Sequence, residues 1–261
     1  MLTDAQVTQI ADDLAEAERN RTMIPLLTAR FDGMTVEDSY RIQNEWRRRG
    51  EEAGRRLVGR KIGLTSKPMQ EATGITEPDY GAIFADMVYE NGSVIEHEQF
   101  SNVRVEVELG FLLKEKLEGP DVTVFDVLRA TEYVTPALEI LSSRIEMEGR
   151  TIVDTISDNA AMGAMVYGGR PVSVDAVDLR WVSALLYRNE TIHDSGVAAA
   201  VLNHPATGVA WLANKLAEHG DHLKAGDFIL AGSFTRPMWV EPGDTVLADY
   251  GELGTVTCRF S

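Results

Sequence analysis

The feature that most restricts the fold of this chain is a change in sequence pattern near Val58. Before it, apolar residues recur at helical spacing. After it, short apolar runs are separated by Gly, Pro and Asn, as in VGRKIGL, YGAIFADMVY and VRVEVELGFLL. Runs of this length and punctuation are typical of β-strands. We therefore expect an α+β fold in which an N-terminal helical segment (residues 1–57) packs on a β-rich body (residues 58–261), both within one domain.

Four segments carry the pattern of a helix. The first opens with a capping box formed by Thr3 and Gln6, and the last has Pro205 in its first turn. The expected helices cover residues 3–14, 35–49, 123–133 and 205–217. Between and after them the pattern predicts strands, including the C-terminal runs DFILAGSF, TVLADY and GTVTCRF.

Charge and composition restrict the partners of the chain. The 261 residues carry a formal net charge of −16, which argues against a nucleic-acid partner because phosphate binding needs clustered Lys and Arg. No apolar run reaches the roughly 18 residues of a membrane span, and the acidic, amphipathic N-terminus is unlike a secretory signal. The single cysteine, Cys258, is expected in the core, and it fits a reducing compartment. We expect a cytoplasmic protein.

Two glutamates share one face of the run RVEVELGFLL. Alternation places Val105, Val107 and their apolar neighbours on one side of the strand. It places Glu106 and Glu108 on the other side. From this strand alone the commoner interpretation is a solvated face, and the alternative is a cation site.

A third carboxylate, Glu139, lies inside the apolar run TPALEIL and has no basic residue nearby before Arg144. Either Glu139 points outward, or it completes a set of three carboxylates. Such a set suits a hard divalent cation, Mg²⁺ or Mn²⁺, with positions left for water and substrate. The set contains no histidine, which disfavours zinc.

Two more charged residues lie in unusual surroundings. Lys61 stands between apolar residues in VGRKIGLT, where a buried ammonium group can serve in proton transfer. A surface lysine is the commoner alternative. Asp79 lies in EPDYGAIF, where Pro-Asp-Tyr-Gly is also an ordinary turn signal.

Seven motifs occur in an order that resembles the 2-keto-4-pentenoate hydratase and 4-oxalocrotonate decarboxylase family, part of the wider group with the fumarylacetoacetase C-terminal fold. The resemblance covers nearly the whole chain. The motifs are GRKIGLTSKPMQ (59–70), EPDYGAIFADM (77–87), RVEVELGFLL (104–113), PALEI (136–140), DTISDNA (154–160), LNHPATGVAWLANKL (202–216) and AGSFTRP (231–237).

The resemblance implies roles for individual residues, and these include the anomalous charges. The implied metal ligands are Glu106, Glu108 and Glu139. The implied catalytic residues are Lys61 and Asp79, and the implied substrate-binding residues are Thr65, Ser233 and Thr235. We add Arg236 as the candidate for a far carboxylate of the substrate, because arginine binds carboxylates with two hydrogen bonds; a surface arginine is the equal alternative.

The resemblance also implies a fold and an activity. The fold is a mixed β-sandwich or roll with peripheral helices, assembled as a homo-oligomer, a pentamer or decamer, and able to associate with another enzyme of its pathway. The activity is the Mg²⁺- or Mn²⁺-dependent addition of water to a 2-hydroxy-2,4-dienoate or 2-oxo-4-enoate. The implied substrate is 2-oxohept-4-ene-1,7-dioate, from the meta-cleavage breakdown of aromatic compounds such as homoprotocatechuate.

Three other functions remain open from the sequence. A metal-dependent decarboxylase of the 4-oxalocrotonate type needs the same chemistry at the substrate's C2 oxygen, and motifs separate it only weakly from a hydratase. A non-catalytic complex partner is a second alternative, against which the complete set of charged residues argues. A hydrolase of the fumarylacetoacetate type is third, because the sequence offers no His–Glu pair to activate water.

Overall fold

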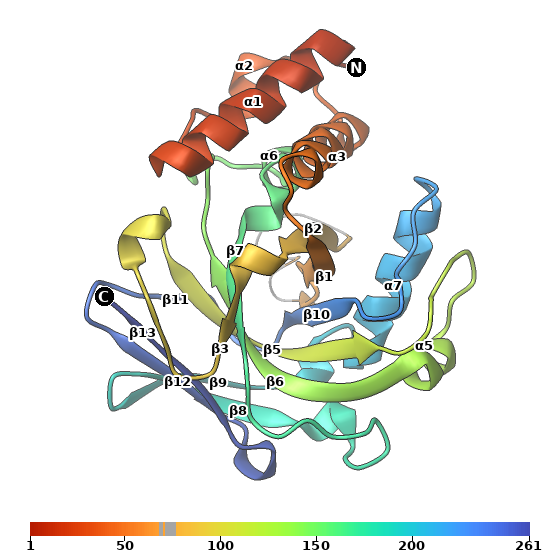
Figure 1. Ribbon diagram of the computed structural model, residues 1–261, viewed down its shortest axis with the longest axis vertical. Helices are drawn as coiled ribbons and strands as arrows, with labels where there is room; N and C mark the ends of the chain where they lie inside the picture. Colours follow the sequence, from red (N-terminus) through yellow and green to blue (C-terminus); the bar gives the residue numbers. More distant parts are fainter. Residues whose placement is uncertain (68–69, 71–76) are drawn as a thin grey trace.

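The computed structural model describes residues 1–67, 70 and 77–261, so Pro68 and Met69 of the GRKIGLTSKPMQ motif lie outside the described residues (Figure 1). Its α-helices are α1 (Asp4–Asn20), α2 (Leu27–Arg30), α3 (Val36–Glu52), α5 (Val124–Ala130), α6 (Ile152–Ser157) and α7 (Pro205–Ala217). Its strands are β1 (Leu57–Gly63), β2 (Asp79–Phe84), β3 (Val88–Glu90), β4 (Ser93–Ile95), β5 (Arg104–Leu113), β6 (Thr131–Leu141), β7 (Met162–Tyr167), β8 (Ser183–Arg188), β9 (Thr191–Val197), β10 (Phe228–Ser233), β11 (Met238–Trp239), β12 (Thr245–Asp249) and β13 (Thr255–Phe260).

Two mixed sheets form the body of the described chain. The larger has the order β2–β1–β10–β5–β6–β7–β3, with β11 paired to β5, and the smaller has the order β4–β13–β12–β8–β9. Parallel pairs (β1 with β10, β3 with β7, β4 with β13) occur among antiparallel ones. The predicted α+β class with a mixed sheet architecture is therefore confirmed.

One apolar core lies between the two sheets. The odd-numbered residues of β5, from Val105 to Phe111, are fully buried in it, as the alternation of the sequence predicts. The smaller sheet contributes Leu186, Val246 and Cys258 to the same core. The larger sheet thus uses one face for packing, which leaves the opposite face of β5 and β6 for other residues.

The N-terminal helices cover part of that opposite face (Figure 1). Ile10 of α1 and Trp46 of α3 belong to a second apolar core, which also contains Ala137 of β6 and Leu230 of β10. Because side chains two residues apart on a strand share a face, Glu139 lies on the same side as Ala137. The helical layer therefore covers the side of the sheet on which the predicted metal ligands lie.

The helix boundaries follow local signals with one correction. Thr3 and Gln6 form the predicted capping box of α1, and α7 spans the predicted residues 205–217. The predicted helix over residues 123–133 is wrong in its second half: α5 ends at Ala130, and β6 begins at Thr131. The β-branched and aromatic residues from Thr131 to Tyr133 pair with β5 instead of continuing the helix.

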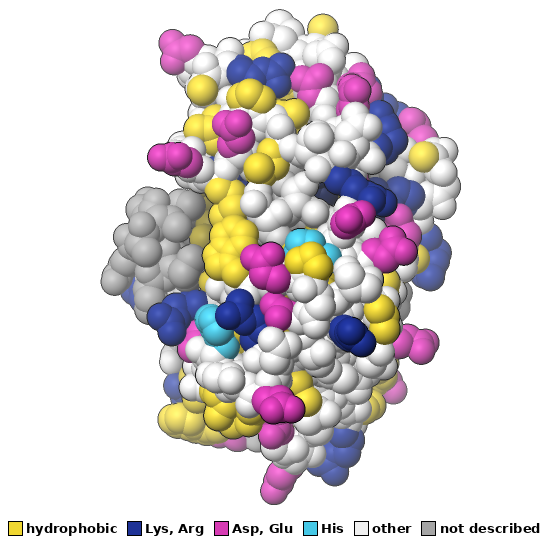
Figure 2. Space-filling view, turned by 90° about the vertical axis from the view of Figure 1, so that its left-hand side faces the viewer, with side chains coloured by type: hydrophobic (Ala, Val, Ile, Leu, Met, Phe, Trp, Pro, Cys, Tyr) yellow, Lys and Arg dark blue, Asp and Glu magenta, His cyan; other side chains and the backbone are white. Residues whose placement is uncertain are grey.

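The surface of the described chain mixes charged, polar and apolar side chains. On the face shown in Figure 2, acidic and basic side chains are interspersed. Within the described residues, no helix is both long and apolar enough to span a lipid bilayer. The oligomeric state of the chain stays a prediction.

Candidate metal centre and active site

Three glutamates meet on the helix-covered face of the larger sheet. Glu106 and Glu108 come from β5, and the register places Glu106 directly opposite Glu139 of β6. Each offers one carboxylate oxygen, and these oxygens lie within 4.8 Å of one another. Like charges directly opposite each other destabilise a sheet. The arrangement therefore calls for a positive charge among the three carboxylates.

The glutamate oxygens are largely without partners. Glu108 and Glu139 are 0% and 1% exposed. The N–H of Gly232 donates to Glu108 Oε2 at 2.8 Å, whereas Glu108 Oε1 and Glu139 Oε2 have no hydrogen-bond partner among the described residues. Buried carboxylate oxygens without partners are costly. A donor set made only of carboxylates fits a hard divalent cation such as Mg²⁺ or Mn²⁺.

Burial and the close approach of the three carboxylates also shift the pKa values of Glu106 and Glu108. Burial, followed by the charge of Glu139, raises the pKa of Glu106 to about 8. The same two causes raise the pKa of Glu108 well above its usual range. In the absence of a cation, these carboxyl groups hold protons at a pH where an ordinary glutamate is ionised. A bound divalent cation would reverse that preference.

Lys61 lies beside the glutamates. Its Nζ is 3.0 Å from Glu139 Oε1, and both side chains are buried. Burial alone would lower the pKa of Lys61, but the carboxylates of Glu139 and Asp79 raise it on balance. Lys61 is therefore a buried ammonium group that keeps its proton at neutral pH.

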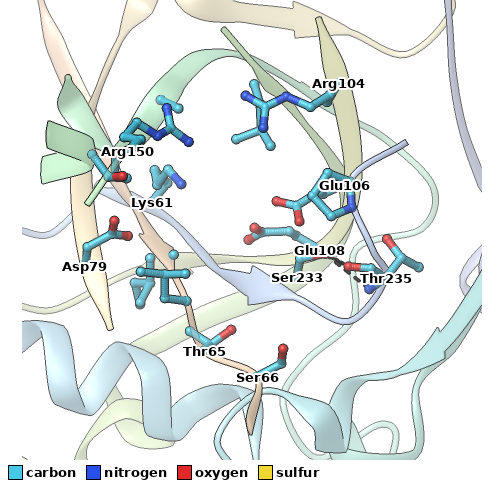
Figure 3. A pocket seen from close by; sticks show the side chains of 18 residues that line it. Lys61, Thr65, Ser66, Asp79, Arg104, Glu106, Glu108, Arg150, Ser233 and Thr235 are labelled. Atoms are coloured by element: carbon cyan, nitrogen blue, oxygen red, sulfur yellow. Dashed lines mark hydrogen bonds between the residues drawn. The ribbon is translucent and has the colours of Figure 1, made fainter. Parts of the chain in front are cut away.

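Asp79 completes the charged part of the cavity (Figure 3). It is 1% exposed at the start of β2 and has no side-chain hydrogen-bond partner among the described residues. Burial raises its pKa, although Lys61 opposes the shift. Gly63 pairs with Asp79 across β1 and β2, and a Cβ at Gly63 would overlap Asp79 Oδ1. The glycine is what lets the carboxylate lie this close to β1.

The predicted substrate-binding residues Thr65, Ser233 and Thr235 all line the same cavity. The hydroxyls of two of them are already engaged. The N–H of Val107 donates to Thr235 Oγ1 at 3.1 Å, and Ser233 Oγ donates to the Thr235 carbonyl oxygen at 2.9 Å. These two residues hold the loop after β10 in place. Thr65 is buried against Gly232, so it fixes the same loop from the other side.

Arg236 lies outside the cavity. Its side chain is 80% exposed, and its Nε lies 3.2 Å from Asp194 Oδ2 on β9. In this extended loop Thr235 is buried and Arg236 points out to solvent. The structure thus assigns Arg236 to the surface, the alternative that the sequence left open.

The structure adds lining residues that the sequence analysis did not single out. Arg104 and Arg150 lie at one end of the cavity, opposite Thr65 and Ser66 (Figure 3). Arg104 shares its strand face with Glu106, so alternation was a usable signal for it. Arg150 lies between β6 and α6, where no pattern in the sequence indicates its position.

A left-handed turn forms another part of the wall. Asn159, Ala160 and Ala161 have φ values of 50°, 51° and 58°, and the two alanines line the cavity. Non-glycine residues rarely adopt this conformation, at about 1 kcal/mol or more each. The Asn159 side chain accepts from the Ala82 N–H at 2.7 Å and donates to the Ala82 carbonyl oxygen at 2.9 Å. The turn is thereby tied to β2, the strand that begins with Asp79.

Comparisons with known proteins agree with this geometry. Residues 56–261 match the family "Fumarylacetoacetate (FAA) hydrolase C-terminal". The chain is 51% identical over 259 residues to the 2-oxo-hept-4-ene-1,7-dioate hydratase of Escherichia coli, covering 97% of each chain. It is 38% identical to a 2-keto-4-pentenoate hydratase of Paraburkholderia xenovorans, covering 99% of this chain and 96% of the relative.

A solved structure gives the same result for the fold. The 4-oxalocrotonate decarboxylase from Pseudomonas putida G7, complexed with magnesium and adipate, superimposes with a TM-score of 0.98 at 37% identity. The match covers 100% of this chain and 99% of that one. The family predicted from the ordered motifs is confirmed.

Proposed function

This chain belongs to the fumarylacetoacetate hydrolase C-terminal family, and we infer that within it the chain is a hydratase of 2-hydroxy-2,4-dienoates and their 2-oxo-4-enoate tautomers. The reaction gives a 4-hydroxy-2-oxo acid. The 51% identity to a hydratase named for 2-oxo-hept-4-ene-1,7-dioate supports a seven-carbon dicarboxylate as the substrate.

One observation of the structure carries the proposal: the ammonium group of Lys61 and the carboxyl group of Asp79 are buried at a cavity beside three glutamates whose carboxylate oxygens converge. Such an arrangement is too costly to serve packing alone, because each group would be cheaper in water or replaced by an apolar residue. Perturbed ionisable groups gathered in a cavity are typical of a catalytic site.

We assign the cation site to Glu106, Glu108 and Glu139, because their oxygens converge and because Glu108 Oε1 and Glu139 Oε2 have no hydrogen-bond partner among the described residues. A divalent ion bound there would supply Lewis-acid stabilisation of negative charge on the substrate's C2 oxygen. Mg²⁺ or Mn²⁺ suits the all-oxygen donor set. The structure of the magnesium-bound relative supports this choice of ion class.

The reaction needs proton transfers and stabilisation of negative charge, and we propose that Lys61 and Asp79 supply them. In the first stage the enol O–H loses its proton and C5 gains one, which gives a 2-oxo-3-enoate. In the second stage the hydroxyl of water adds to C4 and a proton adds to C3. Each turnover consumes one water, and no oxidant or reductant takes part.

The two residues suit different parts of this chemistry. Lys61, whose pKa is raised, keeps its proton at Nζ and can donate a hydrogen bond to an oxygen that gains negative charge. Asp79, whose pKa burial raises, holds a proton more readily than an ordinary aspartate does and can exchange it with the substrate. We therefore assign charge stabilisation to Lys61 and proton exchange to Asp79.

A decarboxylase is the second candidate, and the TM-score of 0.98 to a 4-oxalocrotonate decarboxylase favours it. Both reactions place negative charge on the C2 oxygen, so the same residues serve either one. The higher identity to the hydratase, 51% against 37%, places hydration first.

Incubation of the purified protein with 2-hydroxyhepta-2,4-dienedioate tests the proposal. We expect loss of the dienol ultraviolet band with Mg²⁺, a product heavier by one water, and no reaction with EDTA. The Glu139→Gln variant should behave as the wild type does with EDTA. Release of CO₂ would make the chain a decarboxylase. A protein that neither binds Mg²⁺ nor turns over any dienoate would be the non-catalytic partner.

A further inference from the structure

Two arginines at one end of the cavity share a single hydroxyl group. Arg104 Nη2 and Arg150 Nη1 each donate to Ser143 Oγ, both at 3.0 Å. Ser143 is fully buried. No carboxylate of the described residues lies within ion-pair distance of either guanidinium group. Both guanidinium groups thus bond to the same neutral hydroxyl oxygen, although both carry a positive charge.

Arg104 is the more confined of the two. It is 6% exposed, and its Cζ lies 5.3 Å from the centre of the Trp239 ring. Its Nε donates to the Asn102 carbonyl oxygen at 3.2 Å, while Nη1 has no partner among the described residues. Burial and the neighbouring charge of Arg150 lower the pKa of Arg104 to about 10. A buried guanidinium group without a counter-charge is costly.

The other buried arginines of the described chain are paired. Arg60 Nη2 lies 3.1 Å from Asp221, and Arg144 forms an ion pair with Asp158. Arg104 lines the cavity of the glutamates, and among these three arginines it alone has no carboxylate partner within the described residues. The contrast indicates that its partner comes from outside the chain.

We propose that Arg104 and Arg150 bind the second carboxylate of the substrate, the one remote from the C2 oxygen, and so select dicarboxylates. This inference rests on the proposed function. The two guanidinium groups lie at the far end of the cavity from Thr65, and Lys61 and the glutamates lie between (Figure 3). The fork of N–H donors of an arginine matches a carboxylate with two hydrogen bonds.

Charge balance supports an anionic ligand. Four carboxylates and three cationic side chains lie in or directly beside the cavity, and a divalent ion would give the group one net positive charge. The carboxylates are those of Asp79, Glu106, Glu108 and Glu139, and the cations are Lys61, Arg104 and Arg150. One substrate carboxylate is enough to offset this net charge, so the case for a second carboxylate rests on the position of the two arginines.

The alternative role for the arginines is general charge compensation of the glutamates. Compensation would affect every substrate equally, whereas binding of a remote carboxylate affects only substrates that have one. The test therefore compares 2-hydroxyhepta-2,4-dienedioate with 2-hydroxyhepta-2,4-dienoate, which has the same chain length and a methyl end.

The first variant is Arg150→Ala, because Arg150 lies outside the strands and its removal leaves β5 intact. We expect the ratio of kcat/KM for the diacid to that for the monoacid to fall on the order of 100-fold. Arg150→Lys should restore part of the ratio, since it keeps the charge but not the fork. Arg129→Ala, which removes an exposed arginine on α5, is the matched control and should leave the ratio unchanged.

An equal loss on both substrates would overturn the proposal, as would an unchanged ratio in Arg150→Ala. A shift of the ratio in Arg236→Ala instead would return the role to that exposed arginine. These outcomes all require a wild-type protein that hydrates dienoates, so they differ from failure of the proposed function.

A binding measurement tests the arginines independently of turnover. With Mg²⁺ present, adipate should raise the melting temperature of the wild type more than hexanoate does, and Arg150→Ala should abolish the difference. The proposal fails if adipate and hexanoate act alike on the wild type, or if the variant keeps the full adipate effect.

Discussion

Two groups of buried charges lie on the same side of the larger sheet, and they differ in whether the protein itself supplies their bonding partners. Arg144 and Asp158 are 5% and 1% exposed, and each satisfies the other. The Arg144 N–H donates to Asp158 Oδ2 at 2.9 Å, and its Nη2 donates to the carbonyl oxygens of Asp158 and Met162. In the cavity region, Glu108 Oε1 and Glu139 Oε2 are equally buried and have no hydrogen-bond partner among the described residues, and the Arg104 guanidinium group has no carboxylate partner there.

The difference shows what burial of charge achieves in each place. A saturated pair ties the segment before α6 to the turn after it, and losing either member would leave an unpaired buried charge. In the cavity, the unpaired glutamate oxygens and the Arg104 guanidinium group remain available to a bound ion or substrate. Leaving these groups unpaired lowers the stability of the fold. Four substitutions or conditions separate these two roles, from the largest expected effect to the smallest.

Asp79→Asn should have the largest effect, and it should fall on turnover. The amide keeps the size of the side chain but cannot exchange a proton, so we expect kcat to fall by about 10²- to 10⁴-fold. Metal-free stability should stay the same or rise, because a buried charge without a side-chain partner is removed. Steady-state rates and thermal melts measure both; a variant with wild-type turnover would take Asp79 out of the reaction.

Arg144→Met should lower stability and leave turnover almost unchanged. It leaves the Asp158 carboxylate buried without its counter-charge, so the free energy of unfolding should fall by about 3–5 kcal/mol. Turnover of the folded enzyme at low temperature should stay close to that of the wild type, since Arg144 does not line the cavity. Urea unfolding gives the first quantity. A stable but inactive variant would contradict the assignment of a structural role.

Glu106→Gln should weaken metal binding and leave folding intact. A charged contact of this kind contributes about 1.5–3 kcal/mol, so the affinity for Mg²⁺ should fall about 10- to 100-fold. The metal-free variant should be at least as stable as the wild type at pH 8, because one of three crowded carboxylates becomes neutral. Calorimetric titration with Mg²⁺ measures the affinity. An unchanged affinity would show that Glu106 is not a ligand of the ion.

The smallest effect concerns pH. In the metal-free protein the pKa of Glu106 is raised to about 8, whereas in the unfolded chain it has the ordinary value of a glutamate. Between these values the folded state holds more protons, so stability falls as the pH rises through this window. Mg²⁺ removes that penalty, and the rise in melting temperature that it causes should be larger at pH 8 than at pH 5.5, by a few degrees. Equal shifts at both values would be evidence against the raised pKa.

Much of the molecule could be predicted because the signals are local. Alternation placed Glu106 and Glu108 on one face of β5, and an isolated charge in an apolar run singled out Glu139. Capping patterns located α1 and α7. The resemblance carried by seven motifs supplied the family, which the comparisons confirm. The roles of the individual residues stay proposals.

The remainder depends on contacts between distant segments. The sequence shows Arg104 on the same face as the glutamates, but not that Ser143 joins it to Arg150. Proximity to the loop after β10 made Arg236 a candidate, although neighbouring residues on an extended segment point to opposite sides. The predicted end of α5 is wrong because the helical pattern continues past Ala130 into residues that form the start of β6.

The two glycines that border the cavity determine where its selectivity can change during evolution or engineering. A Cβ at Gly63 would strike Asp79, and one at Gly232 would strike Thr65. At both positions the backbone lies against the side chain of a candidate site residue, so any larger residue there would displace Asp79 or Thr65. Substrates of other lengths must be accommodated at the opposite end, beside Arg104 and Arg150. Under the proposed roles, the cavity has a reaction end where single substitutions disturb Asp79 or Thr65, and a recognition end at the arginines where they do not.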